Sequence, residues 1–307
     1  MNSSTQPFFT ITIPAYNRAY ILPETIESIQ KQTFSQWEII VVDDGSTDNT
    51  ASLISEMAKA DARIRYLFQE NAERSAARNN GADHAHGMYL LFLDSDDSFF
   101  PDHLEKIYKL LEIKSFPVGM VFSNVSYLTE TGLERPEIPE MLDGKEFEYM
   151  LLQPITPSRV CIHKQVFTEF RFDPEIVIVE DLVLWVSIAS KFPVFQLNEA
   201  SCIYRIHGGN SVDLSKNSYL QRYKGLKRLF SNRRYHQVSK LIPENIKRHL
   251  LAECCFNMAR HFEFIGNYRK MTHMLLKSFG HKPGYRNKER LYMFLSHFPL
   301  TKTLLKK

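Results

Sequence analysis

A run of four polar residues, Asp94-Ser95-Asp96-Asp97, carries three carboxylates and one hydroxyl. Carboxylate oxygens at alternate positions suit a hard cation such as Mg²⁺ or Mn²⁺ and leave coordination sites for water or substrate phosphates. The alternative is structural, because Asp97 or Ser98 could cap a helix that begins near Pro101. Short acidic motifs often occur by chance, but this one directly follows a strand-like run, Tyr89–Leu93, which favours the metal hypothesis.

A second acidic segment, Asp43-Asp44-Gly45-Ser46, also follows a strand-like run. Ionised carboxylates only accept hydrogen bonds, so they suit the ring N–H of a base or the hydroxyls of a ribose. The alternative is a tight turn that leads to a helix cap. The sequence has neither Gly-x-Gly-x-x-Gly nor a P-loop, so a bound diphosphate would need another source of positive charge. A metal at Asp96 would provide it.

Two nitrogen-bearing side chains could meet an anion or a metal. Arg78 lies at the start of an expected helix, where backbone N–H groups and the helix dipole favour anions. It could reach a phosphate or a base, or it could form a structural ion pair with one of the carboxylates. His207 follows an expected strand, and neutral imidazole suits Mn²⁺, although a lone histidine is more often an ordinary hydrogen-bonding residue.

The pair Glu180-Asp181 opens an expected helix that contains Trp185. Acids in a first turn stabilise a helix by about 0.3–1 kcal/mol, which is the structural explanation for both residues. The functional hypothesis is that Asp181 acts as a general base for a hydroxyl group. Trp185 lies one turn later on the same helix face, and the alternative for it is a place in the core.

These side chains need elements that bring them together. Four short runs rich in Ile, Val, Phe and Tyr have the length of strands, and the stretches between them have helical spacing. The alternation predicts an α/β fold with a doubly wound, mostly parallel sheet, which binds ligands beyond the carboxyl ends of its strands. Both acidic segments and Pro14-Ala15-Tyr16 should therefore lie together at the edge of the sheet where these strands end. The expected strands are Phe8–Pro14, Glu38–Asp43, Ile64–Phe68 and Tyr89–Asp94, and the expected helices are Leu22–Gln32, Asn49–Lys59 and Ser75–His86.

Charge is divided unevenly along the chain. Residues 214–307 hold 21 Lys and Arg against four Glu and no Asp, a net charge of +17, whereas residues 1–213 carry −14. The acidic first part argues against nucleic-acid binding there, and the basic part suggests an anionic surface such as phospholipid or RNA. The pattern also changes near residue 213, from mixed elements to a C-terminal α-helical extension. The later elements expected are strands Val118–Asn124, Arg159–His163 and Ser201–Ile206, helix Glu180–Lys191, and a helical hairpin at Ala252–Phe279.

The basic extension has apolar residues at helical spacing from Leu220 to Phe230, and Leu291–Leu305 is largely apolar. One interpretation is a set of helices that lie on a membrane surface. The other is a solvated helical subdomain that packs on the rest of the protein. A transmembrane segment is not expected, because no apolar run approaches the roughly 20 residues that cross a bilayer.

The cysteines and the first residues of the chain indicate where in the cell the protein is expected. The four cysteines, at positions 161, 202, 254 and 255, lack metal-ligand spacing and are expected to be reduced thiols. Met1–Pro7 is polar, without a basic start and an apolar stretch, so no secretory signal is predicted. The expected location is the cytoplasm, and a peripheral position on the cytoplasmic face of a membrane is left open.

Taken together, the motifs resemble family 2 of the nucleotide-sugar glycosyltransferases, which have the GT-A fold. The resemblance covers about residues 8–213. Two departures, Val183 in place of an acid and Ala72-Glu73-Arg74 in place of a glycine-bearing stretch, bear on acceptor and sugar preference. The matching segments are Thr12-Ile13-Pro14-Ala15-Tyr16-Asn17, Val41-Val42-Asp43-Asp44-Gly45-Ser46-Thr47-Asp48, Ala77-Arg78-Asn79-Asn80-Gly81, Phe92-Leu93-Asp94-Ser95-Asp96-Asp97, the acidic pair Glu180-Asp181, and His207.

The resemblance implies a nucleotide diphosphate sugar as donor, with a UDP-sugar favoured. Tyr16 and Asp44 would hold the base, with Asp43 nearby and Pro14 and Ala15 in the same loop.

The resemblance also implies roles for the remaining site residues. Arg78 would approach the nucleotide, and Asp94, next to Ser95, would meet the ribose. Asp96 would bind the Mn²⁺ or Mg²⁺ that bridges the diphosphate, with His207 completing the contacts. Asp181 would be the catalytic base.

The function implied is an inverting transfer to an acceptor hydroxyl, in the assembly of surface polysaccharide or glycolipid, with a saccharide or lipid-linked acceptor and no nucleic-acid partner. Residues 8–115 would bind the donor, 116–213 would face the acceptor, and 214–307 would offer the contact to an anionic membrane. Two alternatives stay open. A sugar nucleotidyltransferase would need a glycine-rich, lysine-bearing loop near the N-terminus, which the sequence lacks; a non-catalytic scaffold could bind nucleotide sugars or RNA.

Overall fold

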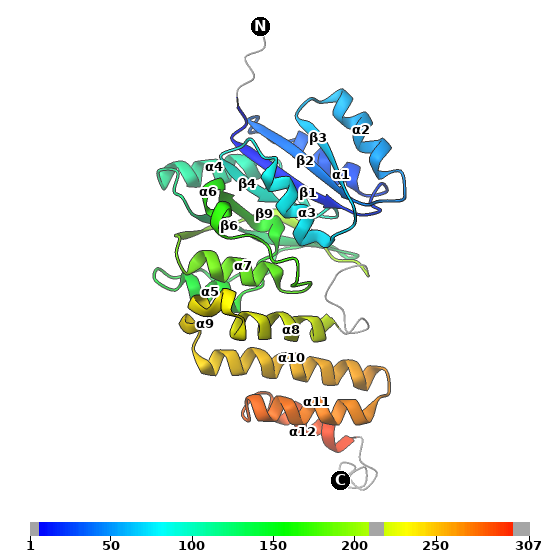
Figure 1. Ribbon diagram of the computed structural model, residues 1–307, viewed down its shortest axis with the longest axis vertical. Coiled ribbons are helices and arrows are strands. Elements are labelled where there is room, and N and C mark those ends of the chain that lie inside the picture. Colours follow the sequence, from blue (N-terminus) through cyan, green and yellow to red (C-terminus); the bar gives the residue numbers. More distant parts are fainter. Residues whose placement is uncertain (1–5, 209–217, 297–307) are drawn as a thin grey trace. The chain divides into compact units, whose positions relative to one another are not determined.

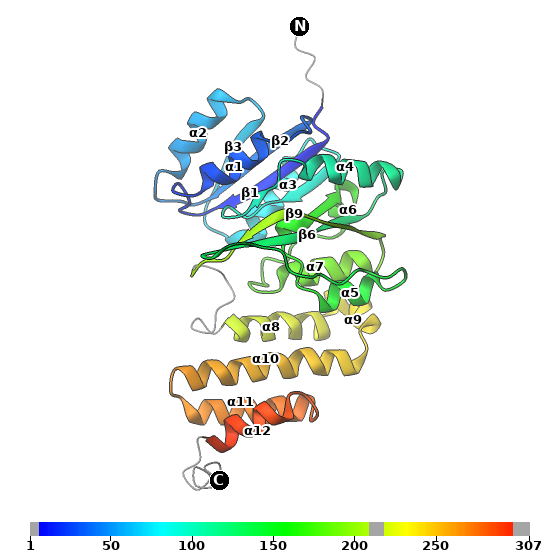
Figure 2. The same cartoon turned by 180° about the vertical axis from the view of Figure 1, so that it is seen from behind.

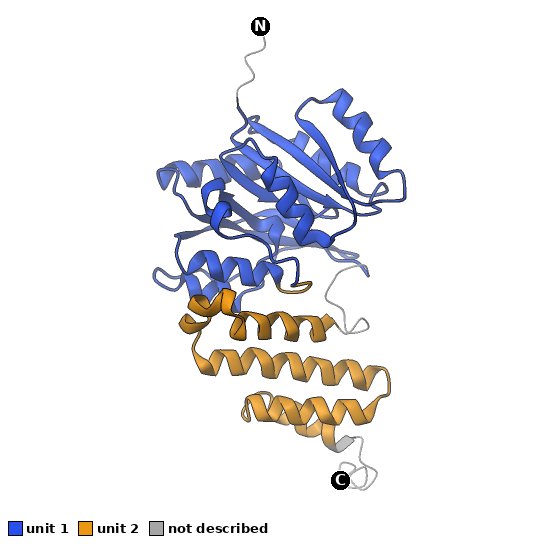
Figure 3. Cartoon of the chain, in the orientation of Figure 1, with its two compact units in different colours: residues 1–175, 180–208 blue, residues 176–179, 209–307 orange. Residues whose placement is uncertain are grey.

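The computed structural model describes residues 6–208 and 218–296, with side chains up to 294 (Figure 1). The chain forms two compact units (Figure 3), of which unit 1 comprises Met1–Glu175 and Glu180–Gly208, and unit 2 comprises Ile176–Val179 and Gly209–Lys307. The boundary predicted at residue 213 lies outside the described residues, as does the part of the apolar stretch 291–305 beyond residue 296.

Unit 1 contains a nine-stranded sheet in the order β3-β2-β1-β4-β8-β6-β9-β5, with β7 beside β6. β3, β2, β1 and β4 are parallel to one another, and β6 and β9 form a second parallel pair. β8, β5 and β7 run antiparallel to their neighbours. The predicted mostly parallel α/β sheet is confirmed. The strands are β1 Phe9–Ala15, β2 Trp37–Asp44, β3 Ile64–Gln69, β4 Tyr89–Phe92, β5 Ser98–Phe99, β6 Met120–Thr129, β7 Gly132–Glu134, β8 Val160–His163 and β9 Val194–Arg205.

Helices cover both faces of this sheet, as Figures 1 and 2 show. Phe9, Ile11 and Ile13 of β1 point to one face and share a core with α1 and α4. Thr12 points to the other face, where α3 packs so closely that a Cβ on Gly81 would lie 2.2 Å from the threonine methyl. The helices of unit 1 are α1 Leu22–Gln30, α2 Thr50–Ala60, α3 Glu73–Asp83, α4 His103–Ile113, α5 Glu146–Leu152, α6 Lys164–Glu169 and α7 Glu180–Ala189, with a 3₁₀ turn, η1, at Pro157–Arg159.

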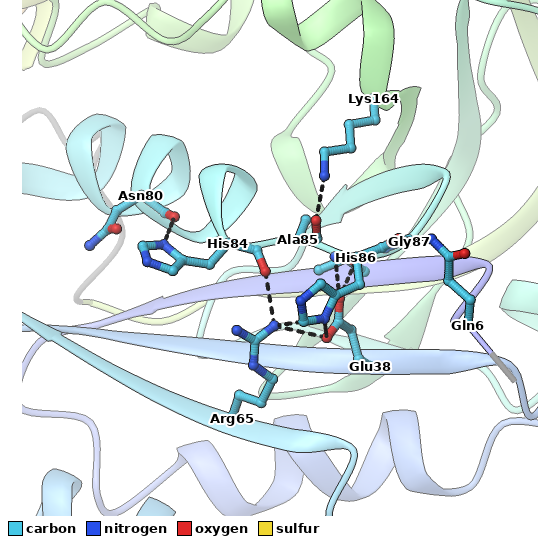
Figure 4. A network of polar contacts seen from close by, with 10 residues as sticks. Gln6, Glu38, Arg65, Asn80, His84, Ala85, His86, Gly87 and Lys164 are labelled. Atoms are coloured by element: carbon cyan, nitrogen blue, oxygen red, sulfur yellow. Dashed lines mark hydrogen bonds and ion pairs between the residues drawn. The ribbon is translucent and has the colours of Figure 1, made fainter. Parts of the chain in front are cut away.

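A buried carboxylate ties the amino ends of the parallel strands together (Figure 4). Glu38, the second residue of β2, accepts hydrogen bonds from the Thr10 hydroxyl at 2.7 Å, the His86 N–H at 2.6 Å and the Arg65 guanidinium at 3.0 Å. These partners come from β1, from the segment before β4, and from β3. The network therefore fixes the strands at the end of the sheet opposite the carboxyl ends that form the predicted site.

The same network makes stability depend on pH. Burial raises the pKa of Glu38, but hydrogen bonds from His86, Thr10 and Arg65 and the charge of His86 outweigh it, so the pKa lies below its ordinary value. A carboxylate with a lowered folded pKa stabilises the fold above its unfolded pKa, about 4.3, and this stability is lost as pH falls through the folded pKa.

Glu38→Gln should therefore lower the free energy of unfolding by about 1–3 kcal/mol at neutral pH, because charge-assisted hydrogen bonds are lost. The difference from wild type should shrink as the pH drops below about 4. Urea unfolding at a series of pH values measures it, with the exposed substitution Glu112→Gln as control. A difference that stays constant with pH would contradict the assignment.

From residue 218 to residue 296, unit 2 consists of helices and the turns that join them. The turn between α10 and α11 places Gly266 at φ +72°, a conformation that glycine adopts without strain, and Asn267 Oδ1 accepts the Lys270 N–H at 3.2 Å. The predicted hairpin at Ala252–Phe279 is thus confirmed. The elements are α8 Ser218–Ser231, the 3₁₀ turn η2 Arg233–Tyr235, α9 His236–Leu241, α10 Glu244–Phe264, α11 Tyr268–His281 and α12 Asn287–Ser296.

Unit 2 uses much of the apolar face of α8 for its own packing. Leu226 and Leu229 are buried, and α8 packs against α10. These two leucines are therefore not available to a membrane, whereas Leu220 is exposed. In the ranges that the structure describes, no helix combines the length and the hydropathy needed to span a bilayer. All four cysteines are buried and free of disulfides.

Candidate active site

The carboxyl ends of β1, β2 and β4 meet at one edge of the sheet, where three loops emerge, and we call this edge the rim. Pro14 and Ala15 of β1 lie in register with Val42 and Asp43 of β2, and Thr12 lies in register with Phe92, the last residue of β4. The loops also touch: the Asn17 N–H donates to Ser46 Oγ at 2.9 Å, and Arg18 Nη2 lies 4.0 Å from Asp96 Oδ2. The structure thus brings together the three segments that the sequence placed at strand ends.

Asp43 and Asp44, the last two residues of β2, hold the loop that follows this strand. Asp43 accepts the Ser46 N–H at 2.8 Å and the Tyr66 hydroxyl at 2.9 Å. Burial, together with the hydrogen bond to Asp43 and its charge, raises the pKa of Tyr66 to about 12. Asp44 Oδ1 accepts the Gln69 amide at 2.6 Å and the Ala72 N–H at 2.9 Å. Both acids therefore hold the segment that follows β2, but neither caps α2, whose N-cap residue is Asn49, and a base contact by either acid stays a prediction.

Tyr16 stands at the same rim with 49% of its surface exposed. Of the two residues before it, Pro14 is partly buried and Ala15 is buried. An exposed aromatic ring beside a polar loop can stack on a planar base. The position agrees with the role expected for Tyr16, and contact with a base stays a prediction.

The two predicted metal ligands lie side by side. His207 Nε2 is 3.0 Å from Asp96 Oδ2, and their side chains are 26% and 18% exposed. The described residues contain no cluster of three or more His, Cys, Asp or Glu side chains that could hold a metal ion. Mg²⁺ and Mn²⁺ nevertheless bind proteins through one or two side chains when substrate phosphates and water complete the shell. One carboxylate and one imidazole, both reachable from solvent, fit such a cation.

Asp97 does not cap a helix, so the capping alternative is wrong. α4 begins at His103, after an N-cap residue, Asp102, whose side chain makes no capping bond. Asp97 is buried and accepts the Ser158 hydroxyl at 2.6 Å and the Arg205 N–H at 3.1 Å. Burial and the charges of Asp94 and Asp96 raise its pKa well above the ordinary value. Its tertiary partners hold the loop that carries Asp94 and Asp96.

Ser95 contributes mainly through its backbone. The residue is buried, and its carbonyl accepts the hydroxyl of Thr25 from α1 at 2.9 Å. The Asp94 N–H donates to Ser158 Oγ at 3.1 Å. The loop between β4 and β5 is therefore held on both sides, by α1 and by η1.

Arg78 is buried between two acids. Its Nη2 donates to Asp94 Oδ1 at 2.6 Å and its Nη1 donates to Glu180 Oε1 at 3.1 Å, while Arg74 Nε lies 3.7 Å from the same Glu180 oxygen. Burial lowers the pKa of Arg78, but the charges of Asp94 and Glu180 outweigh that and raise it. The structural ion pair that the sequence left open is what forms here, and direct contact of Arg78 with a nucleotide stays a prediction.

The Arg78 bridge connects the rim to the start of α7. Asp181, the next residue after Glu180, is partly exposed, and its Oδ1 accepts the Leu182 N–H at 2.7 Å. Trp185 is buried and its ring N–H donates to the Ile155 carbonyl at 2.8 Å, so its core alternative is correct. Val183 is buried as well. α7 is thus held by the ion pair of Glu180 and by the hydrogen bond of Trp185, and Asp181 in its first turn is partly exposed.

Sequence reasoning missed three residues that hold the site. Glu180 was recognised as an acid but not as the partner of Arg78. Ser158 bonds to Asp97, 61 residues away in the chain, and no local signal announces it. Arg205 lies two residues before His207 and links Glu24 of α1, at 2.5 Å, to the Asp96 carbonyl, at 3.3 Å.

Arg78→Met should lower the free energy of unfolding by about 3–5 kcal/mol, because it leaves the buried carboxylate of Glu180 without its closest cation. Denaturant titration followed by circular dichroism measures the change. Lys109→Met, which removes an exposed i,i+4 partner of Glu105, should change the stability far less. Equal losses for both variants would show that the Arg78 bridge does not stabilise unit 1.

Comparison with known proteins points to one family. The model for "Glycosyl transferase family 2" matches residues 10–167. An uncharacterized glycosyltransferase of Rickettsia felis is 36% identical over 214 residues, which cover 68% of this chain and 35% of that protein. The GalNAc(5)-diNAcBac-PP-undecaprenol beta-1,3-glucosyltransferase of Campylobacter jejuni is 31% identical over 223 residues, covering 69% and 70%. The chain spans about a third of the length of the Rickettsia relatives that it matches.

Two solved structures share the architecture. S. aureus TarS 1–349 in complex with UDP-GlcNAc has a TM-score of 0.58 at 16% identity, with 91% of this chain and 93% of that chain covered. Mannosyltransferase PcManGT from Pyrobaculum calidifontis, in complex with GDP-Man and Mn²⁺, has a TM-score of 0.57 at 16% identity, with 99% and 84% covered. At such identities the likeness speaks for the fold, and it confirms the predicted GT-A type.

Proposed function

Because the chain belongs to glycosyl transferase family 2, we propose that it transfers a sugar from a nucleotide diphosphate sugar to the hydroxyl of an acceptor, with inversion at the anomeric carbon. The observation that carries this proposal is the Arg78 bridge. It connects Asp94 at the donor rim to Glu180, the neighbour of Asp181, through bonds of 2.6 and 3.1 Å. One buried side chain thereby connects the loop that would bind the donor to the turn that carries the candidate base.

The donor would lie along the rim. Tyr16 would stack on the base, and Asp44 would accept its ring N–H. Pro14 and Ala15 would line the same loop, with Asp43 next to them. Asp94, beside Ser95, would accept a ribose hydroxyl with the oxygen that Arg78 does not use. A UDP-sugar is the favoured donor, and the complexes of the two solved relatives with UDP-GlcNAc and with GDP-Man support a nucleotide sugar in general.

A divalent cation, Mn²⁺ or Mg²⁺, would be held by Asp96 and His207. When bound there it would offset the negative charge that collects on the diphosphate as it leaves. The Mn²⁺ in the Pyrobaculum mannosyltransferase complex supports this choice of cofactor. Arg18, whose Nη2 lies 4.0 Å from Asp96 Oδ2, would add positive charge on the same side.

In the transfer step the Asp181 carboxylate would take the proton of the acceptor hydroxyl while that oxygen attacks the anomeric carbon. The bond from the anomeric carbon to the diphosphate oxygen breaks, and the nucleoside diphosphate leaves with that electron pair. One displacement with one base gives inversion. Arg78 and Glu180 act as positioning residues, because they fix the first turn of α7 that carries Asp181.

The acceptor would be a saccharide, or a saccharide on a lipid carrier, in the assembly of surface polysaccharide or glycolipid. The name of the Campylobacter relative, which specifies an undecaprenol-linked acceptor, supports the lipid-linked class. The net charge of +17 on residues 214–307 would bring the protein to an anionic membrane surface where such acceptors reside.

Product analysis tests this function. The protein is incubated with Mn²⁺, a panel of nucleotide sugars and a lipid-linked saccharide, and the products are separated by mass spectrometry. We expect a free nucleoside diphosphate and an acceptor heavier by one sugar. Formation of pyrophosphate from a nucleoside triphosphate and a sugar phosphate would identify a nucleotidyltransferase instead, and donor binding without any product would identify a scaffold.

A further inference from the structure

Unit 2 contains a cavity of about 530 Å³ that the transfer chemistry does not use. Three cations line it, Arg260 from α10, Arg286 from the turn before α12, and Lys288 from α12, together with the acids Glu263 and Glu289. The lining therefore carries a net positive charge. Arg286 Nη1 lies 3.8 Å from Glu289 Oε1, a wide separation between two half-exposed side chains that leaves the guanidinium able to turn to another anion.

Apolar side chains also line this cavity. Phe256 and Met293 are buried, and the Tyr292 ring is more exposed. The Arg286 guanidinium carbon lies 5.7 Å from the centre of the Phe256 ring. Cations next to apolar side chains suit a ligand with a charged group at one end and a hydrocarbon part at the other.

An exposed apolar tip lies beside the cavity. Phe264, Ile265 and Tyr268, which surround the α10–α11 turn, are 73%, 52% and 49% exposed. Phe264 comes one helical turn after Arg260, so both project from the same face of α10. Figures 1 and 2 show α12 running back toward this turn. Glu263, which lines the cavity, directly precedes Phe264, so the tip and the cavity adjoin at the C-terminal end of α10.

The chemistry of this end matches a bilayer surface. Aromatic and aliphatic side chains insert at the level of lipid head groups, and Lys or Arg beside them pair with lipid phosphates. Arg269 and Lys270 flank the tip, within a region of net charge +17. An apolar protein partner would account for the exposed tip but would leave this charge without a complement. Anionic lipid accounts for both.

We propose that the cavity binds the phosphate of an anionic phospholipid through Arg260, Arg286 and Lys288, while Phe264, Ile265 and Tyr268 insert into the head-group layer of the bilayer. The inference rests on the membrane contact in the proposed function and gives it a defined site. It is independent of the chemistry at the rim.

Flotation of the full chain with phosphatidylcholine vesicles, with and without phosphatidylglycerol, tests the site. We expect wild type to partition onto the anionic vesicles, and Arg260→Gln combined with Phe264→Ser to partition about tenfold less. Both side chains are exposed, so the fold should survive. The matched control is Lys240→Gln with Leu241→Ser, an exposed pair on α9 with the same change of charge and hydrophobicity, which should float like wild type.

Three results would overturn the inference: equal flotation of wild type with both kinds of vesicle, equal losses in test and control variants, or displacement from vesicles by dilute glycerol 3-phosphate, which would identify a soluble phosphate ligand. Calorimetry with UDP and Mn²⁺ on the same variants separates this outcome from the proposed function. The variants should bind the nucleotide as wild type does, so a failure at the membrane leaves the rim assignment standing.

Discussion

Asp181→Asn should reduce the rate of sugar transfer by about 10²–10⁴-fold, the range that a positioned general base contributes. The amide has nearly the shape of the carboxylate but cannot take up the acceptor proton. Its oxygen can still accept the Leu182 N–H, which Asp181 Oδ1 holds at 2.7 Å, so the first turn of α7 should keep its structure. Transfer is measured as release of nucleoside diphosphate at saturating donor.

Donor binding distinguishes a catalytic loss from a folding defect. Calorimetry should give the Asp181→Asn variant the wild-type donor affinity, because Asp181 would act on the acceptor. Asp83→Asn, an exposed substitution in α3, serves as the control and should keep full transfer. A variant of Asp181 that turns over like wild type would remove this residue from the mechanism.

Asp96→Ala should abolish the part of the donor affinity that depends on Mn²⁺, a loss of about 100-fold, since even indirect partners of metal ligands are worth about 10–100-fold. The loop should survive, because Arg205 bonds to the Asp96 carbonyl at 3.3 Å and Asp97 keeps its own partners. Titration of UDP with Mn²⁺ and with EDTA, by calorimetry, separates the metal-dependent from the metal-independent affinity.

The control for this prediction is Asp102→Ala, which removes an exposed acid next to the same loop. It should bind UDP as wild type does, with and without Mn²⁺. His207→Ala should lose less than Asp96→Ala, because an imidazole adds no negative charge to the site. Mn²⁺ that still strengthens UDP binding to Asp96→Ala would contradict the assignment of the metal ligands.

The parallel part of the sheet was largely predictable because its strands β1, β2 and β4 are buried on both faces. Runs such as Trp37–Asp44 contain few polar residues before the strand ends, and the expected ranges of the first four strands differ from the observed ones by one or two residues. The later strands were predicted less accurately, because β6 continues to Thr129 and β9 begins at Val194, five and seven residues beyond the expected limits. The parallel arrangement then determines which ends meet. The gathering of Tyr16, Asp44 and Asp96 at one rim followed from that rule and from no property of the individual residues.

The contacts inside the site were not predictable, because they join residues that are distant in sequence. Arg78 and Glu180 are 102 positions apart, and nothing near either residue signals the other. The capping alternative for Asp97 was wrong for the same reason, because its carboxylate accepts hydrogen bonds from the Ser158 hydroxyl and the Arg205 N–H, both distant in sequence. Local patterns rank the candidates, and tertiary packing decides their partners.

A crystal grown with UDP and Mn²⁺ gives the most direct test of the account, since anomalous scattering locates the manganese without assumptions about the ligand. The account predicts one anomalous peak within coordination distance of Asp96 Oδ and His207 Nε2, with the diphosphate beside it and the base next to Tyr16. UDP bound at the rim without that peak, or manganese bound elsewhere on unit 1, would contradict it.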